Sequence, residues 1–311
     1  MSVDLTPHLI VPFAQCNGDD WLQAVTALKL KNLDQLLRDM KLIDSDNGHA
    51  DSLSPPHERV LARALSLTTD ADGLIPWAAH EAKGAPGQAW AFITPCHWAM
   101  GREHASLTDP ATLELAEAQS RTLLAAMQPY FSTEGITLHY SQPTRWLAEA
   151  EVFRNLPTAS LDRVLGRNVD RWLPVSKAIK LLQNEMQMLL YTHPVNDERT
   201  ANGQRSVNSF WVSGSGALHE PAKGNPQVNT AANLRQAALT NDWAAYAESW
   251  TQLEATSIAQ FIRHQTSGQP VRLSLCGESN AMTFETTQHG FLTKFKYLLS
   301  PQPSINMLKQ L

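Results

Sequence analysis

The sequence predicts an α/β protein. Short apolar runs of strand length occur at residues 8–14, 89–99, 207–212 and 271–275. Between them lie longer segments, such as residues 21–40, in which leucine, valine and methionine recur at helical spacing. Strands that alternate with helices are typical of a sheet covered by helices, and this order predicts the fold class.

Composition and charge narrow the class of protein. The chain has 311 residues, 43% of them apolar and 18% charged, as expected of a folded soluble protein with one large domain or two ordinary ones. A net charge of -5 argues against a nucleic-acid partner, which requires a basic surface. No stretch approaches 18 apolar residues, so no membrane span is predicted.

The N-terminus and the cysteines predict a cytoplasmic protein. The first 15 residues lack the basic head and continuous apolar segment of a signal peptide. Cys16, Cys96 and Cys276 are widely spaced and odd in number, which suits a reduced compartment and not a disulfide framework.

The first half of the chain divides into alternating polar and periodic segments. Asp109 and Pro110 are a helix-start signal, with aspartate as the N-cap and proline at the first helical position. In chain order we predict a strand at 8–14, one or two helices at 21–40, an exposed loop at 41–56, a helix at 57–67, a loop at 70–87, a strand at 89–99, a helix from 109 to 129, and a strand pair at 135–140 and 145–148.

The second half contains the stretch that carries most of the information, residues 177–216. A helix there stops before Pro194, because a residue that precedes proline is disfavoured in the helical conformation. In chain order we predict a short helix at 160–165, this helix from 177, a loop at 196–205, a strand at 207–212 with a glycine turn at Gly214 and Gly216, helices within 229–264, a strand at 271–275 and a last helix at 291–299.

The first candidate site is the turn between His193 and Gly216. Its proposed ligand-binding residues are His193, Asn196, Arg199, Asn208, Gly214 and Gly216. Arginine and open glycine backbone suit an anion such as phosphate, and strand ends of open α/β sheets are where ligands bind. Arg199→Ala is therefore predicted to weaken anion binding with little effect on stability. The alternative is structural: His193 caps a helix and the glycines let the strand exit tightly.

Three other groups of residues are candidates for a functional or structural role. Cys96, His97 and His104 could form a thiol or zinc site, although adjacent strand residues point to opposite faces and no second cysteine lies at ligand spacing. A local group of basic residues could steer an acidic substrate or be a solvated helix face. It consists of Arg163, Arg167, Arg171, Lys177 and Lys180. Four tryptophans, Trp98, Trp146, Trp172 and Trp211, are predicted to be core or interface.

Several motifs are absent from the sequence. There is no G-x-S-x-G, no P-loop, no G-x-G-x-x-G and no H-E-x-x-H. Gly214 and Gly216 give only a G-x-G. The sequence therefore contains no motif that would predict a serine hydrolase, a nucleotide-binding protein or a zinc metalloprotease.

The run around Pro194 resembles a known family. Its residues are His193, Pro194, Val195, Asn196, Arg199, Gly203, Asn208, Gly214 and Gly216. In this order they resemble the archaeal-type, cofactor-independent phosphoglycerate mutases, a branch of the alkaline-phosphatase superfamily. Residues 30–37 (LKNLDQLL) and the block 90–148 are similar to the early helix and the inserted domain of that family. The whole chain is most similar to a bacterial group known variously as phosphoglycerate mutases or regulatory proteins of the RpfE type.

The resemblance implies a three-layer α/β sandwich with an inserted small α+β domain. The core domain would comprise residues 1–74 and 156–311, and the insertion residues 75–155. In the enzymes of this family, aspartates and histidines hold two divalent metals that activate a serine or threonine, and the metals neutralise the charge that develops on the phosphoryl group.

The sequence departs from this pattern at the catalytic positions. The first strand continues as LIVPFAQCNGDDW, so Asp19 and Asp20 come late in the turn where a metal-binding aspartate would be expected. Ser45, Ser52 and Ser54 are the serines available as nucleophile. The C-terminal segment offers Glu278, Glu285, His289 and Gly290 in place of aspartate and histidine ligands.

These observations lead to three hypotheses. The first is a mutase-like pseudoenzyme with a degenerate metal centre that binds a phosphorylated or anionic metabolite in a regulatory role, with no cofactor. The second is an active phosphoryl-transfer enzyme that binds manganese or zinc through Asp19, Asp20, Glu278 and His289. The third is an interaction scaffold, with a homodimer as one form, in which the tryptophans make the contact.

Overall fold

The computed structural model describes residues 4–67, 71–286 and 304–311, and its chain divides into two compact units. The first unit contains residues 1–51, 55–66 and 223–311, and the second contains residues 52–54 and 67–222. The predicted insertion spanned 75–155, whereas the second unit also takes in residues 156–222. The stretch 177–216 therefore belongs to the second unit.

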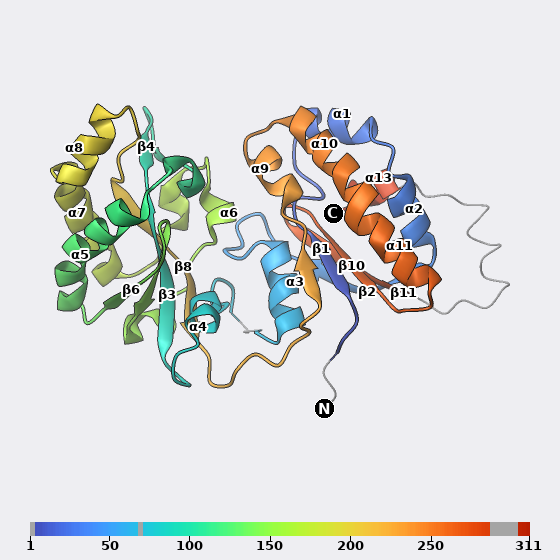
Figure 1. Ribbon diagram of the computed structural model, residues 1–311, viewed down its shortest axis with the longest axis horizontal. Helices are drawn as coiled ribbons and strands as arrows, with labels where there is room; N and C mark the ends of the chain where they lie inside the picture. The colour runs from blue at the N-terminus through green and yellow to red at the C-terminus, as the bar shows by residue number, and fades with distance from the viewer. Residues whose placement is uncertain (1–3, 68–70, 287–303) are drawn as a thin grey trace. The chain divides into compact units, whose positions relative to one another are not determined.

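The first unit is built on a mixed five-stranded sheet, shown in Figure 1. Its strand order is β2 (Met40–Asn47), β11 (Asn280–Thr286), β10 (Arg272–Cys276), β1 (His8–Val11) and β9 (Val228–Thr230). β1 runs parallel to β10 and β9, whereas β11 runs antiparallel to β10 and β2. All four residues of β1 are buried, as expected of a parallel strand covered on both faces.

Helices lie on both faces of this sheet. On one face, Leu9 and Leu273 share an apolar core with Trp250. On the other face, Ile10 packs with Val60 of α3. The helices of the first unit are α1 (Asp19–Thr26), α2 (Lys31–Arg38), α3 (Pro56–Leu65), α9 (Asn233–Leu239), α10 (Trp243–Leu253), α11 (Ala259–Thr266) and α13 (Ser304–Leu308), with a π-helical turn at Glu254–Ile258.

The second unit is built on an antiparallel four-stranded sheet. Its order is β6 (Thr137–Gln142), β7 (Arg145–Glu149), β3 (Ala89–Cys96) and β8 (Ser209–Ala217). One face packs on α5 (Glu117–Thr133), α7 (Lys177–Tyr191) and α8 (Pro194–Ala201), and the other on α4 (Trp77–Ala82). Smaller elements are β4 (Trp98–Met100), β5 (Ala105–Leu107), α6 (Leu161–Val164) and three 3-10 turns at Pro110–Leu113, Glu151–Phe153 and Val169–Trp172.

The mixed α/β prediction is confirmed, and so are most of the elements. The apolar runs at 8–14, 89–99 and 271–275 contain β1, β3 and β10, and the strand pair at 135–148 is the β6–β7 hairpin. Asp109 caps the helical turn that it was predicted to start, accepting a hydrogen bond from the backbone N–H of Ala111 at 3.0 Å. The last predicted helix, 291–299, lies outside the described residues.

Five predictions about elements were wrong. The segment 70–87, predicted to be a loop, holds the helix α4. The polar segment 41–56 holds the edge strand β2, most of whose side chains are exposed and can therefore be polar. The polar segment after Pro194 is α8, because proline is compatible with the first turn of a helix. The glycines after residue 212 lie inside β8 and not in a turn beyond it. Pro129 lies within α5, which continues to Thr133.

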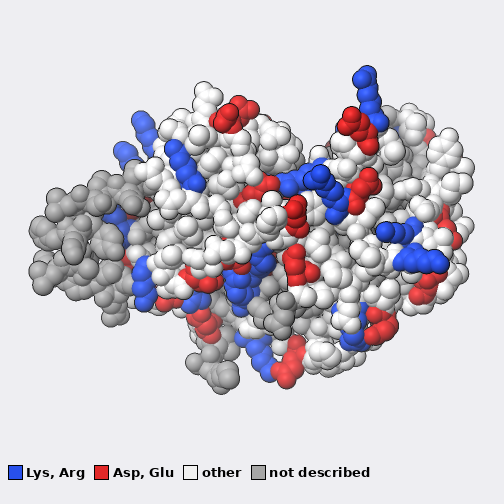
Figure 2. Space-filling view, turned by 180° about the vertical axis from the view of Figure 1, so that it is seen from behind, with Lys and Arg blue, Asp and Glu red and all other residues white. Residues whose placement is uncertain are grey.

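Charges of both signs are mixed on the one face that Figure 2 shows. On the face shown in Figure 2, lysine and arginine side chains of the described residues lie among aspartate and glutamate side chains. No helix within the described ranges combines the length and the apolar content that a membrane crossing requires.

Candidate functional site

Arg199, predicted to lie in an exposed loop, is fully buried on α8. Its guanidinium donates to three protein acceptors: Nε to the carbonyl of Arg205 at 2.8 Å, Nη1 to Oε1 of Gln119 at 2.8 Å, and Nη2 to the carbonyl of Leu113 at 2.6 Å. Hydrogen bonds from a buried charged group are strong, and their loss leaves the acceptors unsatisfied. In this structure Arg199 joins α8 to the segment before α5.

Asn196 and His193 also bind protein atoms. The buried amide of Asn196 donates to the carbonyls of Leu190 and Val207 at 2.8 and 2.7 Å and accepts from the N–H of Val207 at 2.8 Å. His193 is the N-cap of α8, and its Nδ1 accepts from the N–H of Val195 at 3.2 Å. Partial burial lowers the pKa of His193, which favours the neutral imidazole that this acceptor role needs.

The other three predicted residues belong to β8 and the residue before it. Asn208 pairs with Trp98, accepting from its N–H at 2.7 Å and donating to its carbonyl at 3.0 Å. Gly214 has φ of 60° and lies at a β-bulge, where the register between β3 and β8 shifts. Gly216, at φ of 142°, approaches Pro76. Because β8 pairs antiparallel with β3, the strand-end rule for parallel sheets does not apply to it.

The structure brings His193, Asn196 and Arg199 together on α8, and Asn208 lies just before β8. It does not bring the glycines to them, because Gly214 and Gly216 lie towards the far end of β8, on the side of α4. Their ligand-binding role stays a prediction. Arg199 would have to exchange its three acceptors for a ligand.

The other sequence candidates separate in the structure. Cys96 is buried, and burial raises the pKa of its thiol, which disfavours a thiolate. His97 contacts the carbonyl of Ser206 through Nδ1 at 2.9 Å, whereas His104 is exposed. Arg163 was expected on a solvated face and is instead 2% exposed. Trp146, Trp172 and Trp211 are buried and Trp98 is half-buried, as expected of core residues.

A second polar region lies at the carboxyl ends of β1 and β10 in the first unit, where ligands bind in open α/β sheets. Gln15 and Asn17 follow β1, and Glu278 follows β10. Nδ2 of Asn17 donates to Oε2 of Glu278, and Oε1 of Gln15 accepts from the Glu278 N–H at 3.2 Å. Phe13, which has a side chain and yet a φ of 56°, starts the turn. Such backbone strain is common at functional sites.

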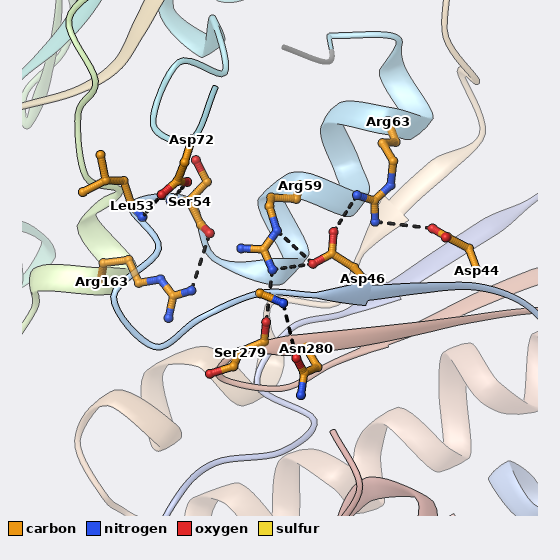
Figure 3. Close-up of polar contacts among 11 residues, drawn as sticks. Asp44, Asp46, Leu53, Ser54, Arg59, Arg63, Asp72, Arg163, Ser279 and Asn280 are labelled. Carbon is orange, nitrogen blue, oxygen red and sulfur yellow. Dashed lines mark hydrogen bonds and ion pairs between the residues drawn. The ribbon is translucent and has the colours of Figure 1, made fainter. Parts of the chain in front are cut away.

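An ion-pair cluster, drawn in Figure 3, fixes the turn that carries Glu278. Arg59 of α3 donates from Nε to Oδ1 of Asp46 at 2.8 Å and from Nη2 to the carbonyl of Ser279 at 3.1 Å. Arg63 donates to Oδ2 of Asp46 at 2.5 Å. Burial alone would raise the pKa of Asp46, but the two arginines outweigh it and the pKa lies below its usual value. These charges are paired with each other and tie α3 and β2 to the β10–β11 turn.

The residues at this edge do not fit a pair of divalent metals. Two catalytic metals need several carboxylates and imidazoles, whereas the strand ends offer the amides of Gln15 and Asn17, the carboxylate of Glu278 and the thiol of Cys16. The carboxylate of Asp46, which lies nearby, is occupied by Arg59 and Arg63. Burial, with the nearby charge of Glu278, raises the pKa of Cys16 to about 12, so the sulfur is protonated at neutral pH. Within the described ranges, no cluster of three histidine, cysteine, aspartate or glutamate side chains could hold a metal ion.

The remaining candidate ligands and nucleophiles are dispersed. Asp19 and Asp20 are exposed in the first turn of α1, where negative charge favours the helix. Glu285 pairs with Arg272, at the start of β10, at 2.5 Å, and so lies at the sheet edge opposite Glu278. Ser45 belongs to β2 of the first unit, and Ser52 and Ser54 belong to the second unit. His289 and Gly290 lie outside the described residues.

In the sequence, the region after the first strand stands out only because no aspartate directly follows the strand. The signal that could have found this edge is the buried run of β1 followed by the polar residues of the β1–α1 turn. The partner, Glu278, is 261 residues away from Asn17 and could not be paired with it from local pattern.

Comparisons with known proteins give distant similarities in structure. No protein-family model matches the chain, and no curated protein matches it. A cofactor-independent phosphoglycerate mutase from Thermoplasma acidophilum is 14% identical, with 98% of this chain and 99% of that chain covered and a TM-score of 0.36. A protein from Pyrococcus horikoshii is 12% identical, with 91% and 88% covered and a TM-score of 0.43. Both TM-scores are too low for either neighbour to support a conclusion about this chain.

Proposed function

We propose that this chain is a phosphoglycerate-mutase-like protein that binds a phosphorylated or anionic metabolite in a regulatory role without converting it. The observation that carries the proposal is the residue set at the carboxyl ends of β1 and β10, where Gln15, Cys16 and Asn17 accompany the carboxylate of Glu278. The nearby carboxylate of Asp46 is already paired with Arg59 and Arg63. A two-metal phosphoryl transfer needs charged ligands that this set lacks. The substrate class comes from the resemblance of residues 193–216 to the mutases.

The alkaline-phosphatase-like sandwich is part of the same proposal. In its support, helices cover both faces of the sheet of the first unit, and its three neighbouring strands β10, β1 and β9 are parallel. The second unit, an antiparallel sheet with helices, is inserted in the first and would correspond to the inserted domain of the family.

Isothermal titration of the full chain with 3-phosphoglycerate, in the presence of a metal chelator, tests the binding part of the proposal. We expect saturable binding with the chelator present, and no formation of 2-phosphoglycerate after prolonged incubation. Binding that appears only when manganese or zinc is added would contradict the proposal, and would favour the enzyme that uses Asp19, Asp20, Glu278 and His289. No binding of any phosphorylated compound would also overturn it.

A second candidate function, a protein-interaction module, is favoured by the outer face of α7. The α7 stripe consists of Leu181, Met188 and Tyr191, with Val175 just before the helix, and these are 48%, 76%, 85% and 92% exposed. Leu181, Met188 and Tyr191 are spaced seven and three residues apart, so they lie on one side, opposite the buried Ile179 and Met186. Exposed apolar surface of this kind marks an interaction site more often than scattered residues do.

The occupant that this second function implies is another copy of the chain. Two α7 helices packed antiparallel about a twofold axis would place the Val175 end of one against the Tyr191 end of the other, which makes the stripe self-complementary. Analytical ultracentrifugation over a range of concentrations tests this. We expect a dimer that Met188→Lys with Tyr191→Lys converts to monomer, whereas a wild-type chain that stays monomeric at the highest concentration would exclude the dimer.

A further inference from the structure

A cavity of about 370 Å³ lies in the second unit beside α4. Its lining residues are Ala79, His80, Lys83, Gly84, Pro86, Leu218, Glu220, Pro221 and Ala222. The volume is within the range of small-molecule sites. The position differs from both regions described above, and no residue of the cavity belongs to the predicted ligand set.

The walls of this cavity are mostly apolar. Ala79 is buried on α4 and packs in the cluster of Trp90 and Phe92, which Leu218 joins from the other side. Two backbone contacts hold the loop after α4: the N–H of Gly87 donates to the carbonyl of Leu218 at 2.7 Å, and the N–H of Ala85 to Oε1 of Gln88 at 2.7 Å. A packed helix and a loop held by two hydrogen bonds therefore bound one side of this cavity.

Two polar side chains of this cavity are available to a ligand. Among the described residues, the side chains of Lys83 and His80 make no hydrogen bond or ion pair. Glu220, by contrast, has an interaction within the protein. An unpaired ammonium beside apolar walls favours a ligand with an anionic group joined to an apolar body. The anionic group can pair with the ammonium while the apolar body contacts the walls.

We infer that this cavity binds a small anion with an apolar body, its phosphate or carboxylate paired with Lys83 and its apolar part against Ala79 and Leu218. The inference rests on the proposed function, since it names a site and a ligand class for the anionic metabolite. His80 supplies a second hydrogen-bonding group at the rim.

The test uses phenyl phosphate as the probe, measured by isothermal titration with the full chain. Inorganic phosphate represents the anion alone, benzyl alcohol the apolar part alone, and benzoate a carboxylate head. We expect phenyl phosphate to bind more tightly than inorganic phosphate or benzyl alcohol. Lys83→Gln should weaken phenyl phosphate roughly twofold to fivefold, since it removes an ion pair at an exposed position, and leave benzyl alcohol unchanged.

Two further variants make the result specific to the cavity. Lys180→Gln removes a lysine of the same charge from the exposed side of α7, and we expect binding equal to that of the wild-type chain. Ala222→Phe, at the partly exposed rim, should fill the cavity and weaken both phenyl phosphate and benzyl alcohol. Circular dichroism of each variant shows whether it folds.

The outcomes separate this inference from the proposed function. If phenyl phosphate and 3-phosphoglycerate bind, but Lys83→Gln and Ala222→Phe bind them as the wild-type chain does, the cavity is the wrong site and the proposed function stands. If no phosphorylated probe binds the wild-type chain, both are overturned. If Lys180→Gln weakens binding as much as Lys83→Gln does, the probe is attracted by the net charge of the protein. That result would also overturn the inference that the cavity is the binding site.

Discussion

Arg199 donates from Nη2 to the carbonyl oxygen of Leu113 at 2.6 Å, across 86 residues of sequence. Together with its bonds to Arg205 and Gln119, this contact makes the arginine a structural link of the second unit, whatever else it binds. The resemblance to the mutases thus falls on residues that also hold the fold.

Arg199→Ala is therefore expected to destabilise the protein, contrary to the prediction from sequence. Truncation leaves the carbonyls of Leu113 and Arg205 and the amide oxygen of Gln119 without their donor and opens a cavity, which together cost roughly 2–4 kcal/mol of the free energy of unfolding. Urea denaturation measures this, with Arg121→Ala as the control, since Arg121 is 55% exposed in an i,i+4 ion pair. A loss for Arg199→Ala no larger than that of the control would contradict the structural role.

Gly214→Ala should cost more stability than Gly203→Ala. Both glycines have positive φ, 60° and 71°, so an added Cβ incurs about 1–2 kcal/mol at either position. A Cβ at Gly214 would also lie 2.8 Å from Cδ2 of Phe92 and 3.0 Å from Cβ of Trp77, whereas at Gly203 it meets nothing within 4 Å. Thermal unfolding of the two variants measures the difference, and equal losses would refute the close packing at the bulge.

His8 is expected to make stability depend on pH between about 6.5 and 4. It is 2% exposed on β1, where Nε2 pairs with Oγ of Ser274 at 2.8 Å. Burial, with the charge of Arg272, lowers its pKa from 6.5 to about 4. Because the unfolded chain then binds the proton more readily, stability is retained above pH 6.5 and lost as the pH falls towards 4.

The expected size of this loss is about 3 kcal/mol, since each unit of pKa shift corresponds to about 1.4 kcal/mol. Denaturation at a series of pH values should show the slope in the wild-type chain and a shallower one in His8→Gln. His49→Gln serves as the control, because His49 is exposed. Parallel pH profiles for His8→Gln and the wild-type chain would show that the histidine is not responsible.

The sequence pattern was sufficient where a segment folds by local rules. The buried run of β1, the spacing of apolar residues in α10 and the N-cap at Asp109 are all visible within a few residues. The sequence pattern was insufficient where the structure of a segment depends on residues far away in the sequence. α8 buries Asn196 and Arg199, and the fold tolerates this because the carbonyls of Val207 and Leu113 accept hydrogen bonds from them.

In the candidate site, too, local features could be predicted from the sequence and contacts between distant segments could not. That no aspartate directly follows the first strand could be read from PFAQCNGDD. The pairing of Asn17 with Glu278 and the cavity beside α4 depend on contacts between segments far apart in sequence. Whether β8 runs in a parallel or an antiparallel sheet likewise depends on its neighbour β3, and a strand's own residues do not specify it.

The most direct test of the central claim is the metal content of the full chain, measured together with its phosphoglycerate mutase activity. After incubation with manganese or zinc and removal of free ions, we expect less than one tightly bound metal per chain and no interconversion of 3-phosphoglycerate and 2-phosphoglycerate. Two metals per chain, with turnover that a chelator abolishes and either ion restores, would contradict the account and establish an active enzyme.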